Sequence, residues 1–190
     1  MTVDPAYRML PPVDSEANHR AERLRVLGIK EEPDPDFDQF ARQLAATVQA
    51  QYAMVNIVGP QRQYFAGLYP SSADRGVNWQ VDPVRAMACD HGYCMHVVAR
   101  GHAMSLPDVL DYARHAVNPV VEENGIRAYL GAPLLDVDGM VLGTICVLDT
   151  KPRPDWGSEA VEWIKGRAAE LAELILRRAG APDAPGGVWP

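Results

Sequence analysis

The sequence predicts an α+β fold in which helices cover both faces of a sheet, a layered α/β/α arrangement. The expected elements come in the order helix, helix, strand, strand, helix, strand, helix, hairpin, helix. The strand expected at residues 140–148, MVLGTICVL, is apolar on both faces, as a strand covered on both sides should be. Antiparallel pairs, with turns expected near Gly59-Pro60 and at Asp138-Gly139, argue against a doubly wound parallel sheet.

Composition limits the class of protein. The chain has 190 residues, 47% of them hydrophobic, which fits one domain with a real core. A net charge of -7 gives no long-range attraction to nucleic acid or to an anionic membrane. We identify no signal peptide, and the longest strongly apolar run is far short of the ~20 residues that span a bilayer. Three cysteines without framework spacing indicate a reducing compartment, so we expect a soluble, cytoplasmic protein.

The N-terminal part is expected to be a flexible arm followed by two helices. Residues 1–14 form the arm, because they are rich in proline and have no periodicity. Residues 15–29 have apolar positions at helical spacing. Residues 31–51 form a stronger helix that Asp34 or Asp36 can cap. The apolar face of that second helix is Phe37, Phe40, Ala41, Leu44 and Val48.

The middle of the chain is expected to alternate short elements. Two strands are predicted at 52–59 and 61–69, followed by a loop over 70–83. A short helix lies between the glycines at 92–101, and residues 103–108 form a short strand or extended segment.

The C-terminal part is expected to contain the hairpin and a long helix. Residues 112–125 form a short helix or loop broken at Asn118-Pro119. Residues 127–150 form the hairpin, and residues 155–178 form the helix, with apolar positions at a helical repeat. In the second hairpin strand we expect one face to carry Leu142, Cys146 and Leu148, and the other to carry Val141, Ile145 and Val147.

Several motifs resemble, in order, those of a GAF domain of the bacterial sensor type, a small-molecule-sensing fold related to PAS. The segment at 34–58 resembles the family's opening helix and first strand, and RQYF at 62–65 resembles its second strand. HGYCMHVV at 91–98 resembles an H-S-F-C-x-H-x-V segment. Residues 118–153 contain an N-P pair, a YLGAPL strand, a D-G turn and a LGTICVLD strand followed by PR. Cys89 departs from the family pattern.

The resemblance implies a central six-stranded antiparallel sheet with the terminal helices on one face. The other face would carry a ligand pocket roofed by the shorter helices and loops. One GAF domain would then occupy residues 15–178, with a disordered tail at 179–190, and the module would stand alone. The aspartate and lysine arrangement of the cyclic-nucleotide-binding subgroup is not recognisable here.

The sequence has one dense cluster of cysteines and histidines, the residue types that could bind a metal or react as thiols. Its members are Cys89, His91, Cys94 and His96. A continuous helix or a continuous strand would split these four residues between two sides, so only a loop before Gly92 could bring them to one metal ion. Four readings stay open. Cys94 is a buried core residue while His96 lines the pocket; the four form a closed metal site; the segment binds haem or another cofactor; or Cys89 and Cys94 form a redox-active thiol pair. Cys146 is interpreted as core.

Other residues could line a ligand pocket or serve the scaffold alone. Arg127 could contact an anionic ligand or make an edge salt bridge, and Tyr129 could form a pocket wall or simply pack. Asn118 fixes a turn or lies at a pocket rim. His115 is a plausible lid residue. The full set of candidate ligand-binding residues is His91, Tyr93, Cys94, His96, Asn118, Arg127 and Tyr129.

The function expected from these features is small-molecule sensing in signal transduction, without catalysis. The signal would pass through homodimerisation by the terminal helices, or to a partner protein in trans. One alternative is a thiol-dependent enzyme of the free methionine-R-sulfoxide reductase type. Another is a sensor that carries haem or a redox cofactor; bilin attachment is disfavoured because Met95 separates Cys94 from His96. We assign no catalytic or metal-binding residue, and the cofactor is left unknown.

Overall fold

The computed structural model describes residues 12–70 and 85–180. Most of the expected arm, of the loop at 70–83 and of the tail at 179–190 lies outside the described residues. Within them, the strands form one six-stranded sheet in the order β3-β2-β1-β6-β5-β4, and all neighbouring strands are antiparallel. The strands are β1 (Tyr52–Val58), β2 (Arg62–Tyr69), β3 (Ala86–Ala88), β4 (Met104–Leu106), β5 (Ala128–Leu135) and β6 (Val141–Asp149).

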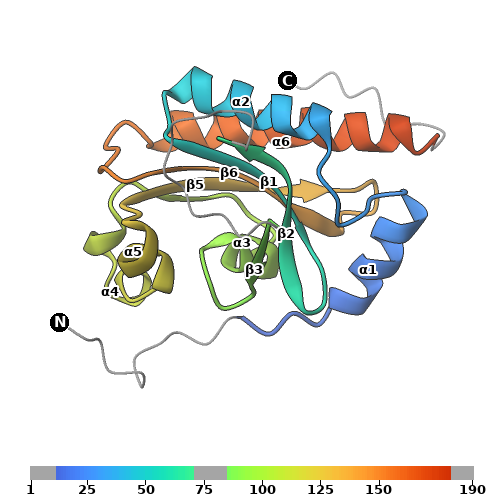
Figure 1. The fold of residues 1–190 in the computed structure, drawn as a ribbon, viewed down its shortest axis with the longest axis horizontal. Helices are drawn as coiled ribbons and strands as arrows, with labels where there is room; N and C mark the ends of the chain where they lie inside the picture. The colour runs from blue at the N-terminus through green and yellow to red at the C-terminus, as the bar shows by residue number, and fades with distance from the viewer. Residues whose placement is uncertain (1–11, 71–84, 181–190) are drawn as a thin grey trace.

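Helices cover both faces of this sheet, which confirms the layered α+β prediction. Helices α2 and α6 lie side by side on one face, and α3, α4 and α5 lie on the other, as Figure 1 shows. Helix α1 packs beside β1 and β6. The helices are α1 (Ala17–Val26), α2 (Pro35–Val48), α3 (Cys94–Arg100), α4 (Ala113–Ala116), α5 (Pro119–Asn124) and α6 (Ser158–Arg178).

Helix α2 shows how local sequence signals fix an element. Asp34 is its N-cap, and the carboxylate accepts hydrogen bonds from the backbone N–H groups of Asp36 and Phe37. Pro35 occupies the first turn, where its missing N–H costs no helical hydrogen bond. The predicted apolar face is confirmed, because Phe37, Phe40, Ala41 and Leu44 are buried and Val48 packs against them.

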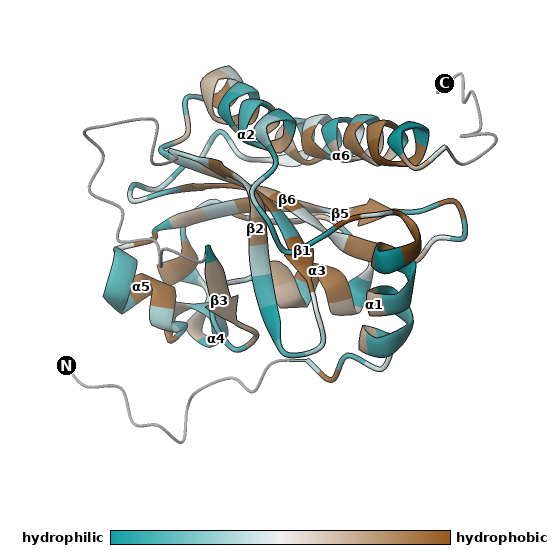
Figure 2. Ribbon diagram, turned by 45° about the vertical axis from the view of Figure 1, so that its right-hand side comes forward, coloured by the Kyte–Doolittle hydropathy of each residue, from teal (hydrophilic) through white to brown (hydrophobic). Residues whose placement is uncertain are grey.

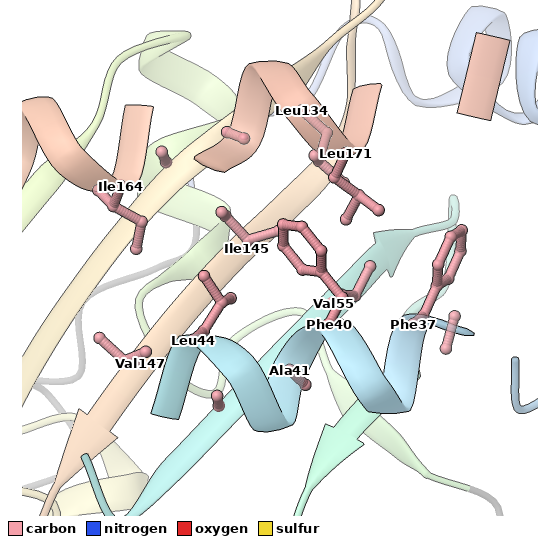
Figure 3. Close-up of a cluster of buried hydrophobic side chains, with 14 of the residues drawn as sticks. Phe37, Phe40, Ala41, Leu44, Val55, Leu134, Ile145, Val147, Ile164 and Leu171 are labelled. Atoms are coloured by element: carbon pink, nitrogen blue, oxygen red, sulfur yellow. The ribbon is translucent and has the colours of Figure 1, made fainter. Parts of the chain in front are cut away.

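The main hydrophobic core lies between the sheet and the helices α2 and α6. Figure 3 shows Phe40 and Leu44 of α2 and Ile164 and Leu171 of α6 meeting strand residues such as Ile145. Burying one such aliphatic side chain stabilises the fold by roughly 1.5–3 kcal/mol. This core also receives Trp156, which is buried just before α6.

The face assignment of β6 was wrong at two of its six positions. Leu134 pairs with Gly143 and Leu135 pairs with Val141, so Leu142 is an extra residue in a β-bulge. The bulge turns Leu142 onto the α2/α6 face instead of the face of Cys146, while Val141 packs on the opposite side against Met95 and Val98 of α3. Beyond the bulge the alternation is as predicted, with Ile145 and Val147 on one face and Cys146 and Leu148 on the other.

Two further differences concern short elements. Strand β3 has only three residues, too few to show a period, and it was not expected from the sequence. Residues 112–125 form two helices, α4 and α5, because Asn118 and Pro119 end one and start the next. No helix within residues 12–70 and 85–180 is both long enough and apolar enough to cross a membrane.

Candidate functional site

The second hydrophobic layer lies between the sheet and the short helices α3, α4 and α5, and we call it the α3–α5 layer. Apolar strand residues such as Met54, Phe65 and Leu148 form its floor. Polar and titratable side chains are buried among them, and Figure 2 shows the short helices below the sheet, opposite α2 and α6. The members with polar or titratable groups include Tyr52, Asn56, Gln63, Tyr93, Cys94, His96, His115, Tyr129, Thr144 and Cys146.

Two thiols meet at the centre of this layer. Cys94 is the first residue of α3, and its Sγ lies 3.8 Å from Sγ of Cys146 on the central strand β6. The hydroxyl of Tyr129 donates to Cys94 Sγ over 3.5 Å. The thiol of Cys146 lowers the pKa of Cys94 by hydrogen bonding to its thiolate, which outweighs the opposing effect of burial. The same interaction, with burial, raises the pKa of Cys146, so Cys94 is the more acidic thiol.

Tyr129 reaches Cys94 because the neighbouring position on its face of β5 is a glycine. A Cβ built on Gly131 would lie 2.2 Å from the Tyr129 hydroxyl oxygen, so any side chain there would displace the ring. Tyr129 is fully buried, and burial raises its pKa well above the ordinary value. The phenol therefore stays protonated at neutral pH and keeps a proton to donate.

An aromatic and histidine group forms the roof of the layer. The Tyr93 ring lies edge-on to Tyr129, with centroids 5.3 Å apart, and its hydroxyl donates to the His115 carbonyl over 3.0 Å. The rings of His96 and His115 are 5.3 Å apart. Burial lowers the pKa of His96 to about 4, with added repulsion from His115 and from nearby arginines. Burial also lowers the pKa of His115, so both imidazoles are neutral at pH 7.

A row of polar side chains crosses the sheet beneath α3. Asn56 of β1 and Thr144 of β6 face each other across the ladder. Nδ2 of Asn56 donates to Oε1 of Gln63 over 2.9 Å, and Nε2 of Gln63 donates to the carbonyls of Ala88 and His91. Through these bonds, the floor of the layer is tied to the chain segment that precedes α3.

Within the part of the chain that the structure describes, three buried polar atoms of this layer have no hydrogen-bond partner: Asn56 Oδ1, Thr144 Oγ1 and His115 Nδ1. A buried polar group without a partner costs roughly 1–3 kcal/mol. Thr144 Oγ1 also lies near enough to Cys94 to stabilise its thiolate once that forms. The layer is thus apolar overall and offers unused acceptors and a hydroxyl at defined points.

Asn118 holds the loop before α3 in place. The Gly92 N–H donates to Asn118 Oδ1, and Asn118 Nδ2 donates to the Gly92 carbonyl, each over 2.9 Å. Gly92 has a φ of +74°, which a side chain would disfavour. Asn118 also caps α5, where Pro119 follows it. The expected turn-fixing role is therefore confirmed, and Asn118 joins α5 to α3.

The structure brings only some of the predicted site residues together. Tyr93, Cys94 and Tyr129 are in mutual contact, and His96 joins them through His115. Asn118 lies next to them, on the loop that leads into α3.

The other predicted site residues have different surroundings. His91 is partly exposed, with Nδ1 2.7 Å from Asp90. Arg127 pairs with Asp108 through two hydrogen bonds of 3.0 and 2.6 Å, which is the edge salt bridge. Cys89 packs in a different apolar cluster from Cys94, and the thiol that meets Cys94 is Cys146, which the sequence analysis interpreted as core.

Asn56 and Thr144 were not identified from the sequence as site residues, although a signal for them was present. Each is a polar residue in a strand that is otherwise apolar on both faces. A polar side chain enclosed in this way needs a partner, so it marks a polar point inside the fold.

Two open cavities lie away from the α3–α5 layer. One has a volume of about 610 Å³ and lies between the segment that joins α1 to α2 and the C-terminal end of α6. The other, of about 270 Å³, lies beside α1 and the end of β1. Neither is lined by a predicted site residue.

Comparison with known proteins identifies the family. The family model described as the GAF domain matches residues 32–176, most of the chain. This chain belongs to the GAF domain family. Over 183 residues this GAF domain is 27% identical to the cyclic di-GMP phosphodiesterase PA2567 of Pseudomonas aeruginosa. The match covers 94% of this chain but only 29% of the Pseudomonas protein.

Solved structures confirm the GAF fold. The GAF domain of an Acinetobacter phosphoenolpyruvate-protein phosphotransferase has a TM-score of 0.58 at 16% identity, over 91% of this chain and 100% of that one. Free methionine-R-sulfoxide reductase from Neisseria meningitidis has a TM-score of 0.54 at 15% identity, over 92% of this chain and 96% of that one. At such identities the likeness shows the fold alone.

Proposed function

We propose that this GAF domain is a regulatory module that binds a small molecule in the α3–α5 layer and does not catalyse a reaction. Its family makes it a sensory signalling module. The observation that carries the proposal is the set of three unpaired polar atoms, on Asn56, Thr144 and His115, buried in this one layer. A ligand that satisfies them gains hydrogen bonds with little competition from water.

The chemistry of the layer suits a small, uncharged ligand with hydrogen-bond donors. The unpaired oxygen of Asn56 accepts hydrogen bonds; Nδ1 of neutral His115 donates or accepts according to its tautomer, and the hydroxyl of Thr144 can donate or accept. The guanidinium of Arg127, the residue expected to meet an anion, is already neutralised by Asp108. Aromatic faces of Tyr93 and Tyr129 would pack against the apolar parts of the ligand.

Entry of the ligand requires the roof to move, because Tyr93 and Tyr129 now fill the interior of the layer. The roof consists of helices of seven, four and six residues, which have little stability of their own. We propose that α3 and α5, joined by the Asn118–Gly92 bonds, shift together and carry the signal outward.

The ligand proposal is tested with the full chain. Native mass spectrometry and an absorbance spectrum of one sample report a retained compound or a haem Soret band together. A panel of uncharged metabolites is then tested for a shift in Tm of the wild type, of Thr144→Val and of Thr47→Val. Thr47 is exposed on α2 and serves as the matched control. We expect a shift that Thr144→Val abolishes and Thr47→Val preserves; equal shifts in all three proteins contradict the proposal.

For the outward signal we propose homodimerisation through the terminal helices, or a partner protein in trans. Most of the apolar stripes of α2 and α6 are used against the sheet, but Trp163 and Leu174 of α6 remain partly exposed. Light scattering tests this directly, and a clean monomer at high concentration in the presence and absence of ligand leaves only the partner protein. We propose that this chain regulates signalling, as a sensory GAF domain does.

A thiol-dependent reductase is the second candidate, and the contact between Cys94 and Cys146 favours it. The more acidic Cys94 would be the nucleophile and Cys146 the resolving thiol. Turnover of free methionine-R-sulfoxide that is lost in Cys94→Ser but kept in Cys89→Ser would establish this function. Absence of turnover in the wild type would eliminate it. We propose a location in the reducing cytoplasm, which the three free thiols support.

A further inference from the structure

We propose that Cys94 and Cys146 close into a reversible disulfide when the protein meets a hydroperoxide, and that this bond ties α3 to β6. The second half rests on the proposed function, since a tied α3 would keep a ligand out of the α3–α5 layer. The bond would make the domain a sensor of oxidants as well as of its ligand.

The geometry of the two thiols carries the proposal. Their sulfur atoms are 3.8 Å apart, and a disulfide bond is about 2.05 Å long, so the sulfurs must approach by about 1.8 Å. Cys146 is fixed, because β6 is paired with β1 and β5 at this point, and its cross-strand partner on β5 is Gly131, which has no side chain. Cys94 lies on a seven-residue helix of the roof, so the movement falls to that side.

The surroundings make Cys94 the thiol that reacts first. Both thiols are buried, but Cys94 lies on the short roof helix α3 and Cys146 on the central strand β6, so an opening of the roof exposes Cys94 first. The Tyr129 hydroxyl donates a hydrogen bond to the Cys94 sulfur, and the Thr144 hydroxyl lies close enough to donate one to the thiolate. Donors of this kind stabilise the thiolate, which is the form that attacks a peroxide.

The first step oxidises Cys94. Its thiolate attacks one oxygen of the hydroperoxide ROOH, a sulfur–oxygen bond forms and the oxygen–oxygen bond breaks. The leaving alkoxide takes up a proton equivalent to the one that the thiol released, and departs as the alcohol ROH. The product at Cys94 is a sulfenic acid.

The second step joins the two sulfurs. Cys146 attacks the sulfur of the sulfenic acid, the sulfur–sulfur bond forms and the sulfur–oxygen bond breaks. The hydroxide that leaves takes the thiol proton of Cys146 and departs as water. In sum, two thiols and one hydroperoxide give one disulfide, one alcohol and one water. The two electrons lost by the sulfurs reduce the peroxide.

Cys89 provides a control within the same chain. It packs against Val58, Met95 and Val98, an apolar cluster separate from the one that contains Cys94 and Cys146. Its pKa is raised by burial and by the negative charges of Asp14 and Asp90. Cys89 is half-buried and therefore more accessible to an oxidant than Cys94 or Cys146. Its surroundings nevertheless disfavour the thiolate.

The test treats the folded, reduced full chain with hydrogen peroxide and then maps its peptides by mass spectrometry. We expect a loss of about 2 Da, the two thiol hydrogens, and a single cross-link between the peptides of Cys94 and Cys146 that dithiothreitol reverses. Cys89→Ser should give the same cross-link, and Cys146→Ala should give none. Amide hydrogen exchange over Cys94–Arg100 should slow at least about tenfold in the oxidised wild type.

The result that overturns the proposal is a wild type in which Cys94 stays a free thiol, or in which the cross-link involves Cys89. Mapping the wild type needs no variant, so a misfolded Cys146→Ala protein would not obscure the answer. No ligand is added in this experiment. Its failure would leave the ligand-binding test with Thr144→Val untouched, and a failed ligand test would leave the cross-link untouched.

Discussion

The two faces of the sheet are built by different means. The α2/α6 face is covered by helices of 14 and 21 residues, and its buried side chains are almost all apolar. The α3–α5 face is covered by helices of seven, four and six residues and encloses thiols, imidazoles, an amide and a hydroxyl. One face therefore gains its stability from packed apolar area. The other gives up part of that area to polar and titratable groups, to which we assign the proposed responses to a ligand and to an oxidant.

This difference predicts that the two faces open with different free energies. A long amphipathic helix gains apolar contacts along its whole length, whereas each short helix of the roof is held by a few specific bonds. The roof should therefore exchange its amide hydrogens through local opening, and α2 and α6 only through global unfolding. The predictions below test that contrast, from the largest expected effect to the smallest.

Leu171→Ala should have the largest effect. Leu171 is fully buried between α6 and the sheet, so the substitution removes apolar contacts and leaves a cavity. We expect a loss of about 3–4 kcal/mol in the free energy of unfolding, measured by urea denaturation. Val137→Ala, at a side chain that is 49% exposed, is the matched control and should change stability little. Similar losses in the two variants would show that the α2/α6 face is not the stable half of the molecule.

The apolar face is also the half that the sequence predicted best. The helical spacing of Phe37, Phe40 and Leu44, with a capping aspartate ahead of them, specified the buried side of α2 and placed its cap at Asp34 or Asp36, but the helix ends at Val48 and not at the expected residue 51. The one clear error, at Val141 and Leu142, arose where a β-bulge interrupts the alternation. A bulge is set by how two strands pair, and the residues of one strand alone do not show it.

Acid should act on the other face. Burial lowers the pKa of His96 to about 4. Between pH 6.5 and 4, His96 is therefore protonated in the unfolded chain but neutral in the folded chain. Stability is therefore unaffected above pH 7 and falls as the pH drops through this window. From pH 7.5 to 5 we expect a loss of about 2 kcal/mol from this group.

The measurement is urea denaturation at both pH values for the wild type, His96→Asn and His102→Asn. His102 is exposed and controls for the loss of an imidazole at the surface. The part of the loss that comes from His96 should disappear in His96→Asn and remain in His102→Asn, while the contribution of His115 remains in all three proteins. If all three proteins lose the same stability, then His96 does not govern the acid response.

Asn118→Ala should loosen the roof by a smaller amount. It removes the cap of α5 and the two bonds to Gly92, so we expect a global loss of about 1–2 kcal/mol. Amide exchange over Cys94–Arg100 should become faster, while exchange in α6 should follow only the global loss. Asn124→Ala, at the last residue of α5, is the control. Equal acceleration in α3 and α6 would mean that the roof has no opening of its own.

The site itself was only partly readable from the sequence. The resemblance to the GAF family drew attention to Tyr93, Cys94 and His96, but it left Cys94 without its partner. Cys146 lies 52 positions further along the chain, and only the pairing of β6 with its neighbours brings its thiol under α3. Contacts between a strand of the sheet and a helix of the roof depend on tertiary packing. The spacing of residues along the sequence does not predict them.

The smallest effect is expected for Arg127→Met. Arg127 and Asp108 form a partly exposed ion pair, and ion pairs that solvent reaches stabilise proteins by about 1 kcal/mol or less. The methionine keeps the apolar stem of the side chain, so the loss of stability in urea should be small, and smaller still at high salt. If Arg127 were instead a contact for an anionic ligand, the variant would lose ligand-induced thermal shifts while keeping its own Tm. Arg127 would then exchange Asp108 for the ligand, and the pair would not be an edge salt bridge that serves the scaffold alone.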